Sequence, residues 1–477
     1  GDLPVPTKCP SLHVTSVFAG WLAVSGRTNI EISAATVVGT ASDHTLYAKW
    51  IVETNSCGDA EDTALASKGQ YAGYFYGDVP FAETNVPAIR GTFALIVTST
   101  KGGLIAKASL QSGPVNFSSK AWSSTNADGT CRVDLVARSG ETLALSVRQN
   151  RIWGTLSGGS IGAVAYTLEG ARNRFSDRSD SEAEGYLSRF GGYSTVALPP
   201  FAVDSTGDAH LGVEGSGYLT LSVDKGGSVK IAGVLADGTS FSQSTALLLF
   251  DGCGPDACAP LFVPLYKRQG AVGGLLWFSP SGDVAILTDR YANWFVRWEK
   301  PARSPDGVSV LMDAVGGYYS SVSALAAQYT LSAQTNSVTY AYSGGSADLQ
   351  TAALPNGVGV ARSGSRLVIA PSTRPIKSPD GVYDYSAENS AMTSFVFNPR
   401  SGVFKGYFNL YYDYSLSGVR KHKTVRVPYA GILAPVRAAD FSEEPAGQGF
   451  YLVPDNDPLL PAANLLRSFR MTLDAAP

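Results

Sequence analysis

Few residues in this chain have the type and spacing that catalysis requires. Residues 158–162, Gly-Gly-Ser-Ile-Gly, match the G-x-S-x-G pattern that exposes a nucleophilic serine on a strand-to-helix turn of an α/β sheet. That chemistry also needs an acid and a histidine that activate the serine. Here the motif lies among β segments of a chain rich in glycine and serine, so we interpret it as a glycine loop.

Histidine and acidic residues do not have the arrangement of a metal or hydrolase site. The chain has 4 histidines, and no two are close enough in sequence to suggest a metal pair. Glu182 and Glu184 lie in residues 171–185, where charges of both signs alternate, which is typical of a solvated connector rather than a catalytic acid pair. We therefore expect no catalytic residue, metal or cofactor, and we do not expect an enzyme.

The 5 cysteines point to disulfides. Cys253 and Cys258 enclose a turn-rich Gly-Pro-Asp-Ala loop that a local disulfide can close, with free thiols as the alternative and a metal site as the least favoured one. Cys9 and Cys57 flank one compact segment and could tie its ends together. Cys131 is then the odd cysteine, which we expect to be buried as a small hydrophobe. Two disulfides would place the chain in an oxidising compartment.

Two groups of aromatic residues are the candidates for ligand binding. Flat aromatic rings suit the apolar face of a pyranose, so either group could stack on a glycan. The candidates are Tyr407, Tyr411, Tyr412 and Tyr414 in one segment, and Trp294 and Trp298 in another. The alternative for the tyrosines is packing in a core or a module interface. For the tryptophans it is core packing, because Trp294, Val296 and Trp298 alternate as the residues of a core-facing strand do.

The elements that must position these residues are predicted to be β-strands. Charged residues make up only 16% of the chain, against a usual share of about 25%, while glycine, tyrosine and phenylalanine are frequent. Between Tyr218 and Leu235, apolar residues alternate with polar ones on both sides of a Lys-Gly-Gly turn. The segment 92–110 repeats this pattern with a second Lys-Gly-Gly turn, which indicates a duplicated hairpin module.

The length and the polar stretches predict several folded units. A chain of 477 residues suggests about three domains. The polar run at residues 53–69 and the charge cluster at residues 171–185 are the expected connectors. The expected division is residues 1–58 as a small N-terminal module, then β modules at residues 67–172, 185–301 and 304–477.

Charge and hydropathy argue against nucleic acid and membrane partners. The formal net charge of -3 offers no clustered basic surface for a polyanion. The longest apolar runs are far shorter than the ~20 residues that span a bilayer, so we do not expect an integral membrane protein. Residues 1–20 lack a basic start followed by an apolar core, and we expect any export signal upstream of this sequence.

Residues 1–50 carry a resemblance to a known family. The blocks Gly1–Thr7, Phe18–Trp21 and Asp43–Trp50 resemble the Listeria/Bacteroides repeat, the internalin-type B repeat, in the family's order and spacing. The resemblance implies a small β-grasp-like module of the kind arrayed on very large secreted or surface-attached bacterial proteins. Family members open with a further strand before the Leu-Pro block, at which this sequence begins. We expect either trimming of a longer chain or donation of the missing strand by a neighbouring chain.

The second and third β modules are similar to modules at the C-terminal ends of very large repeat-bearing surface proteins in planctomycete and verrucomicrobial bacteria. The residues that carry this likeness are Gly217–Thr239, Leu261–Phe278, Val396–Tyr412, Val427–Gly431 and Gly449–Pro454. The resemblance implies location and modularity, and it assigns no role to a particular residue.

These observations predict an all-β chain of tandem antiparallel β-barrel or β-sandwich modules. The expected function is that of a secreted or cell-surface structural or adhesive protein, which could assemble into a fibre or sheath by strand pairing between subunits. The expected partners are further copies of the chain, other surface proteins and polysaccharide. The alternatives are an array of carbohydrate-binding modules and, last, a glycan-active enzyme.

Overall fold

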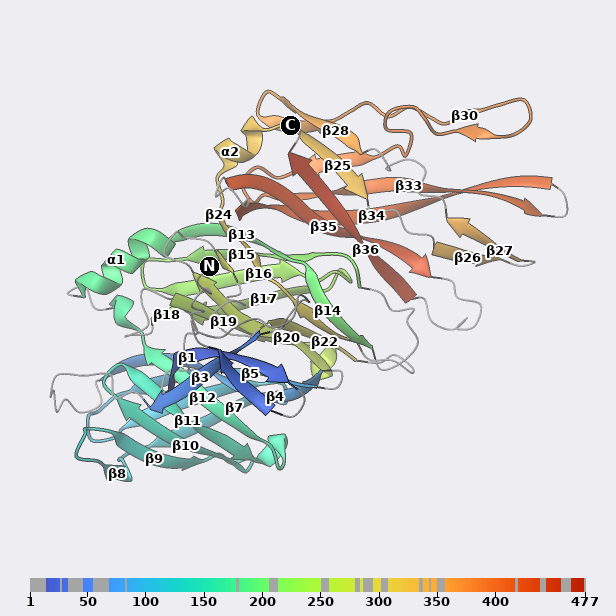
Figure 1. The fold of residues 1–477 in the computed structure, drawn as a ribbon. Coiled ribbons are helices and arrows are strands. Elements are labelled where there is room, and N and C mark those ends of the chain that lie inside the picture. The colour runs from blue at the N-terminus through green and yellow to red at the C-terminus, as the bar shows by residue number, and fades with distance from the viewer. Residues whose placement is uncertain are drawn as a thin grey trace.

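The protein is described from a computed structural model. The described residues are 14–25, 28–32, 46–54, 68–81, 84–176, 180–205, 213–249, 257–278, 284–285, 295–301, 308–333, 338–342, 345–349, 357–416, 419–437, 443–455 and 465–475. These residues form antiparallel sheets with two short α-helices, α1 (Ser181–Phe190) and α2 (Ser321–Ala326), so the predicted all-β class is confirmed. Three large sheets follow one another along the molecule (Figure 1).

The N-terminal sheet has three strands in the order β2-β1-β3. They are β1 (Val14–Ser25), β2 (Thr28–Ile32) and β3 (Leu46–Thr54). The block that ends at Trp50 forms most of β3, where it pairs antiparallel with β1 and places Trp50 opposite Phe18. The predicted terminal strand of this segment is therefore present.

The first module is a 9-stranded sheet in the order β7-β6-β5-β4-β12-β11-β10-β9-β8. It curls until β7 contacts β9, and its inward-facing residues form one apolar core. Cys131 belongs to this core and is fully buried, as expected for an odd cysteine that acts as a small hydrophobe. The strands are β4 (Gly69–Phe81), β5 (Thr84–Val97), β6 (Leu104–Leu110), β7 (Gly113–Ser119), β8 (Ser124–Thr125), β9 (Cys131–Val136), β10 (Glu141–Arg148), β11 (Arg151–Gly158) and β12 (Ala165–Arg172).

The second module is a 12-stranded sheet. Most of its strands follow the order β14-β23-β22-β20-β21-β24-β13-β15-β16-β17, and β18 and β19 join through β20. The strands are β13 (Gly192–Leu198), β14 (Pro200–Ser205), β15 (Gly217–Val223), β16 (Ser228–Val234), β17 (Ser240–Ala246), β18 (Leu248–Leu249), β19 (Ala257–Leu265), β20 (Gly270–Phe278), β21 (Val284–Ala285), β22 (Val296–Lys300), β23 (Val308–Met312) and β24 (Val315–Tyr318).

The third module is an 8-stranded sheet in the order β29-β28-β25-β36-β35-β34-β33-β32, with two small strand pairs beside it. Its strands are β25 (Tyr329–Ala333), β28 (Val358–Ser363), β29 (Arg366–Ile369), β32 (Ser394–Phe397), β33 (Val403–Leu416), β34 (Val419–Arg437), β35 (Glu443–Asp455) and β36 (Leu465–Ala475). The small pairs are β26 (Val338–Tyr342) with β27 (Gly345–Leu349), and β30 (Ile376–Lys377) with β31 (Tyr383–Asp384). The predicted last strand completes the sheet from its middle, between β25 and β35.

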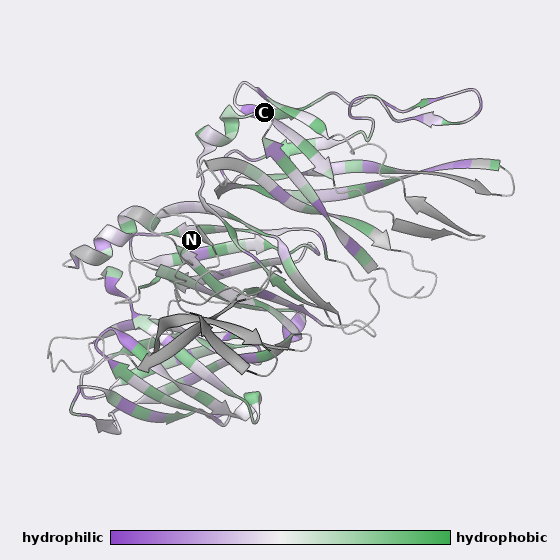
Figure 2. Ribbon diagram, viewed as in Figure 1, coloured by the Kyte–Doolittle hydropathy of each residue, from purple (hydrophilic) through white to green (hydrophobic). Residues whose placement is uncertain are grey.

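Both predicted hairpins are confirmed. β15 and β16 pair from Tyr218 with Val234 to Val223 with Val229, and the segment 92–110 forms the end of β5 and all of β6. Along these strands hydrophobic and hydrophilic residues alternate (Figure 2). Tyr218 alternates with the core-facing Leu219, yet it is also nearly buried, because the third module covers part of that face.

Two boundaries differ from the expected ones. β23 and β24 were assigned to the third module, but they pair with β14, β22, β13 and β21, so the second sheet extends to Tyr318 rather than to residue 301. The charge cluster at residues 171–185 was expected to be a solvated connector, but it contains the start of α1. The Asp180 carboxylate accepts from the Ala183 amide and pairs with Arg174 at 2.6 Å, and this N-cap explains the helix.

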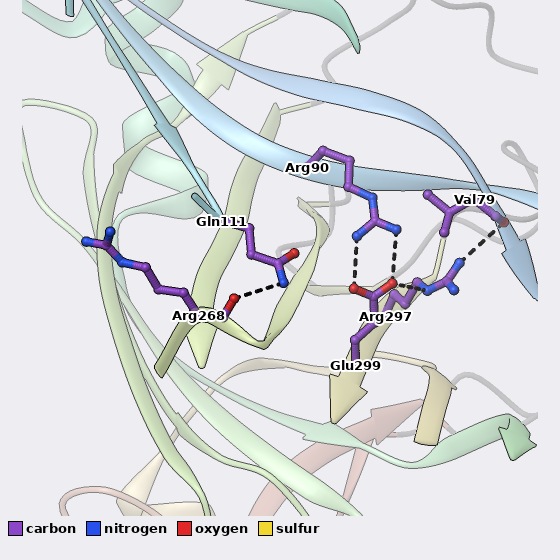
Figure 3. A network of polar contacts seen from close by, with 6 residues as sticks. All are labelled: Val79, Arg90, Gln111, Arg268, Arg297 and Glu299. Carbon is purple, nitrogen blue, oxygen red and sulfur yellow. Dashed lines mark hydrogen bonds and ion pairs between the residues drawn. The ribbon is translucent and has the colours of Figure 1, made fainter. Parts of the chain in front are cut away.

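The first and second modules meet through an apolar patch and a polar network. Tyr74 and Ile89 of the first module pack on second-module residues such as Leu275 and Trp277. Beside the patch, both terminal nitrogens of Arg90 donate to the Glu299 carboxylate at 2.9 Å, and Arg297 pairs with the same carboxylate at 2.9 Å (Figure 3). This network joins β5 to β22.

The third module has a core of its own and also contributes three buried residues to the core of the second module. Ile432, Ala434 and Phe450 of β34 and β35 belong to the same cluster of buried residues as the interior of the second module. The Thr195 hydroxyl donates to the Leu433 carbonyl at 2.8 Å across this interface. Among the described helices, neither has the length and apolar character that crossing a membrane requires.

Candidate functional site

The strongest candidate site is a group of four aromatic rings on the third module, which we call the aromatic platform. Its members are Tyr383, Tyr385, Tyr411 and His422. Tyr411 and His422 lie in the long antiparallel pair β33–β34, and Tyr383 and Tyr385 lie in and just after β31. Figure 1 shows the β33–β34 ribbon and the β30 hairpin extending from the third module on the same side of the molecule.

The four rings form two parallel layers. The centroids of the Tyr383 and His422 rings are 3.9 Å apart, with an interplanar angle of 17°. Those of the Tyr385 and Tyr411 rings are 5.0 Å apart, with an angle of 22°. Within the layers, the Tyr383 and Tyr385 centroids are 6.2 Å apart at 14°, and those of Tyr411 and His422 are 5.5 Å apart at 23°. Tyr383 and Tyr385 therefore lie side by side on a base of two further rings.

The lower layer is fixed by burial and hydrogen bonds. Tyr411 is only 4% exposed, its hydroxyl donates to the Ser390 carbonyl at 2.8 Å, and burial raises the pKa of that hydroxyl. The Tyr385 hydroxyl lies 3.4 Å from His422 Nδ1, and the Thr424 hydroxyl lies 3.5 Å from His422 Nε2. These contacts orient both lower rings before any ligand arrives.

The upper layer follows from strand geometry. Side chains two residues apart point to the same side of an extended chain, so Tyr383 and Tyr385 share one side while Asp384 between them is exposed. A tight turn precedes them, in which the Gly381 amide donates to the Ser378 carbonyl at 3.0 Å and Gly381 adopts a φ of 85°. The turn returns the chain so that Tyr383 pairs with Lys377.

Cationic side chains lie close to the half-buried Tyr383 ring and to the exposed Tyr407 ring. Lys377 Nζ is 5.8 Å from the centre of the Tyr383 ring. On the β33–β34 pair, the Arg426 guanidinium is 4.3 Å from the centre of the Tyr407 ring, in cation–π geometry. A ligand on this surface would therefore meet both flat rings and positive charge.

The aromatic residues that the sequence analysis proposed for glycan binding lie in different environments. Tyr407 is 46% exposed and Tyr411 is the buried base ring of the platform, whereas Trp298 is fully buried in the second-module core and is not accessible to a glycan. Trp298 Nε1 donates to the Tyr266 hydroxyl at 3.0 Å, which satisfies its polar atom. Trp294 and the side chains of Tyr412 and Tyr414 lie outside the described residues.

Sequence reasoning missed Tyr383, Tyr385 and His422. His422 lies under Tyr383 and beside Tyr411, because the β30–β31 hairpin folds over β34. The available signal was the Tyr-Asp-Tyr spacing that begins one residue after a Ser-Pro-Asp-Gly turn. That signal predicts two tyrosines on one side of a hairpin, and it does not reveal which surface they cover.

The described part of the chain contains no disulfide. Cys258 was expected at the end of an exposed loop, but it is buried within β19 opposite Trp277, in the patch between the first and second modules. Cys253, Cys9 and Cys57 lie outside the described residues, so their pairing stays a prediction.

Ser160 in the G-x-S-x-G segment has a structural environment. It lies in a short 3-10 turn, Gly159–Ile161, that follows β11, and its hydroxyl and amide donate to Glu141 Oε1 at 2.7 and 3.0 Å. Burial alone would raise the pKa of Glu141, but hydrogen bonds from Ser139 and Ser160 outweigh it and hold that pKa at about 2. A carboxylate with so low a pKa is a poor general base. Its hydrogen bonds instead hold the loop of Ser160 against β10.

No metal centre forms among the residues that the structure describes, where no three His, Cys, Asp or Glu side chains come together. The chain matches no protein-family model, no curated protein and no solved structure. The resemblance of residues 1–50 to the internalin-type B repeat therefore stays a prediction, and the aromatic platform rests on its own geometry.

Proposed function

We propose that this protein is a non-catalytic, extracellular adhesive protein that binds polysaccharide through the aromatic platform of its third module. The observation that carries the proposal is the side-by-side arrangement of the Tyr383 and Tyr385 rings, 6.2 Å apart and nearly parallel, on a base of two more rings. Flat rings in this arrangement suit the apolar faces of pyranose units. Two neighbouring rings support contact with more than one sugar of a chain.

The rigidity of the platform supports a binding role. A surface tyrosine loses rotamer freedom when it immobilises a ligand, and that loss reduces affinity. Here the lower rings and the hydrogen bond from Tyr411 to Ser390 already hold the upper rings in place. The upper rings therefore lose most of their rotamer freedom when the protein folds, and they lose little more when a ligand binds.

Local charge favours acidic polysaccharide over neutral polysaccharide at this surface. Lys377 lies near Tyr383, and Arg426 and Lys405 lie on the adjacent strands. A uronic acid places a carboxylate beside its sugar ring, so one residue of the polymer could contact a tyrosine face and a cation together. We expect polygalacturonate or alginate to bind more tightly than an uncharged glucan.

Affinity electrophoresis of the whole chain in gels that contain polygalacturonate, alginate or dextran tests the proposal. The variants Tyr383→Ala and Tyr385→Ala should each weaken binding to the acidic polymers by about five-fold, because one stacked ring contributes about 1 kcal/mol. Tyr318→Ala is the matched control, because Tyr318 is 66% exposed on β24 of the second module, outside the platform. Retarded migration that persists unchanged in the Tyr383→Ala/Tyr385→Ala double variant would contradict the proposal, as would no retardation of the wild type in any gel.

Self-association through the N-terminal sheet is a second candidate. Among the described residues, β2 and β3 each pair only with β1, so the sheet has two open edges. Unpaired edges present backbone donors and acceptors to another strand. Native mass spectrometry over a hundred-fold range of protein concentration should detect dimers or longer assemblies if this sheet pairs between subunits, and a monomer throughout that range would argue against a fibre.

A further inference from the structure

A groove of about 680 Å³ lies between the second and third modules, away from the aromatic platform. Strands β15, β16 and β17 contribute residues along one side, the end of β19 contributes Val263, Pro264 and Leu265, and the segment that leads into β33 contributes Ser401 and Val403. Both modules are therefore needed to form it.

The groove opens where the second-module sheet fails to close on itself. β17 pairs with β16, β19 pairs with β18 and β20, and no backbone ladder joins β17 to β19 in the described residues. The Gln243 side chain fills this seam by donating to the Pro260 carbonyl at 3.4 Å and accepting from the Phe262 amide at 2.7 Å. Beyond Gln243, toward Ser240 and Leu265, the seam remains open and becomes the groove.

The lining of the groove is uncharged and mixes rings with hydroxyl groups. Among the described residues, no Asp, Glu, Lys, Arg or His belongs to its lining. The rings are Tyr193, Tyr218 and Phe241, and the hydroxyls include Thr220, Ser240, Ser242 and Ser401. An ion would lose its hydration without a partner of opposite charge here, so this chemistry selects a neutral ligand with both apolar faces and hydroxyl groups.

Tyr218 provides the second observation that points to a ligand. Its side chain is 8% exposed and lines the groove, yet its hydroxyl has no hydrogen-bond partner among the described residues. Its neighbour Tyr193 differs, because the Tyr193 hydroxyl donates to the Ser401 carbonyl at 3.1 Å. Burial raises the pKa of Tyr218, so the hydroxyl keeps its proton and remains a donor. A nearly buried donor without a protein partner is suited to an acceptor that enters the groove.

We propose that this groove is a second carbohydrate site, which takes a neutral oligosaccharide and binds one of its hydroxyl oxygens with the Tyr218 hydroxyl. A peptide strand is the less favoured occupant, because Pro260 and Pro264 remove two backbone donors from the β19 edge that such a strand would use. The site deepens the proposed adhesive function, but it does not depend on the aromatic platform. Because residues of two modules line the groove, a bound glycan would also hold those modules together.

Isothermal titration of the whole chain with maltohexaose, cellohexaose, laminarihexaose, xylohexaose and mannohexaose tests the proposal. At least one of these neutral probes should bind the wild type. Tyr218→Phe keeps the ring and removes only the hydroxyl, and it should weaken that binding by about ten-fold. Ser242→Trp should abolish it by filling the groove. The Tyr383→Ala/Tyr385→Ala double variant is the control and should bind the same hexasaccharide with unchanged affinity.

The outcomes separate this site from the platform. Binding that Tyr218→Phe and Ser242→Trp reduce, and that the platform double variant retains, supports the groove. The proposal is overturned if no neutral hexasaccharide binds, if Tyr218→Phe binds as the wild type does, or if the platform variant loses the binding. Circular dichroism melts of each variant identify a folding defect, and Tyr218→Phe should melt within about 2 °C of the wild type, because the hydroxyl that it removes has no hydrogen-bond partner among the described residues. Acidic polymer binding, measured separately, reports on the platform alone.

Discussion

The two interfaces between the large modules are built from different chemistry. The interface of the first and second modules carries ionisable groups, including Arg90 with Glu299 and the buried Glu169 that accepts from the Tyr74 and Tyr76 hydroxyls at 3.0 Å. The interface of the second and third modules is formed by apolar residues such as Ile432 and Phe450. Its hydrogen bonds include neutral ones, such as that between the Thr195 hydroxyl and the Leu433 carbonyl, and Glu214 of the second module lies near Tyr451 of the third.

This difference indicates how each pair of modules is coupled. The first module has its own core, and only a small separate patch joins it to the second module. The third module also has its own core, but it inserts Ile432, Ala434 and Phe450 into the core of the second. Charge pairs fix the orientation of two surfaces but contribute modest net energy, whereas a shared core makes unfolding of one module expose the other. We therefore expect the second and third modules to unfold together and the first to unfold separately.

The largest effect should come from Phe450→Ala. Phe450 is nearly buried where the third module enters the second-module core, so its loss should leave a cavity and reduce the free energy of unfolding by about 3–5 kcal/mol. Hydrogen exchange with mass spectrometry in urea should detect lower protection in both modules. Phe117→Ala is the control, because Phe117 lies in the first-module core and should affect that module alone. Loss of protection confined to the third module in Phe450→Ala would refute the shared core.

Arg90→Ala should have the next largest effect. The side chains of Arg90 and Glu299 are 12% and 24% exposed, and truncation leaves Glu299 with Arg297 as its ion-pair partner among the described residues, so we expect a loss of about 2 kcal/mol. Although burial alone would raise the pKa of Glu299, the hydrogen bonds and charges of Arg90 and Arg297 lower it below 4.5. The stabilisation is therefore present above pH 4.5 and is lost as the pH falls through the folded-state pKa.

Urea unfolding of the first module between pH 3 and pH 7 measures this contribution. Arg268→Ala is the control, because Arg268 also reaches the first module, donating to the Ser112 carbonyl at 2.9 Å, but at an exposed site. Its loss should cost less than about 0.5 kcal/mol at every pH. An equal loss in Arg90→Ala and Arg268→Ala would show that the Glu299 pair contributes no more than a surface contact.

Thr195→Val should have a smaller effect at the other interface. The substitution removes the hydroxyl that donates to the Leu433 carbonyl and leaves that carbonyl unpaired in a buried position, at a cost of about 1 kcal/mol. Because both partners are neutral, the loss should be independent of pH from 4 to 8. Thr98→Val removes an exposed hydrogen bond to the Gly103 carbonyl and serves as the control. A pH-dependent loss in Thr195→Val would reveal an ionisable group at this interface.

The smallest effect, and the one with opposite sign, should come from Glu169→Gln. Burial raises the pKa of Glu169, and the hydrogen bonds from Tyr74 and Tyr76 lower it only in part. The folded state therefore holds the proton more tightly, so its contribution to stability is fully present below pH 4.5 and is lost as the pH rises through the folded-state pKa. The variant should lack this pH dependence and gain up to about 1 kcal/mol at pH 8. Urea midpoints at pH 4 and pH 8 measure the gain. The Arg90→Ala variant keeps Glu169 and weakens the pH dependence of Glu299. If this variant became more stable with rising pH, the prediction would be contradicted.

Local pattern predicted the hairpins because their contacts are close in sequence. In β15 and β16, the alternation of Leu219 and Leu221 with polar residues indicates which face of the hairpin is buried, and the glycine turn sets the register of the two strands. The same reasoning succeeded for the segment 92–110 and for the last strand. It failed for β23 and β24, because their pairing with β14 and β13, about 100 residues earlier in the chain, leaves no local mark, and the nearby pairing of β22 with β23 was taken as a module boundary.

The amino-acid sequence by itself determined the all-β class, the hairpins and the burial of Cys131, since each follows from side-chain alternation and turn residues within a short segment. Only the tertiary structure decided which surfaces meet. Tyr383 and His422 stack although 39 positions separate them, and Tyr218 turned from a surface residue into part of a groove because another module covers its strand. Contacts of this kind depend on how finished sheets pack, and packing selects among surfaces that local periodicity leaves equivalent.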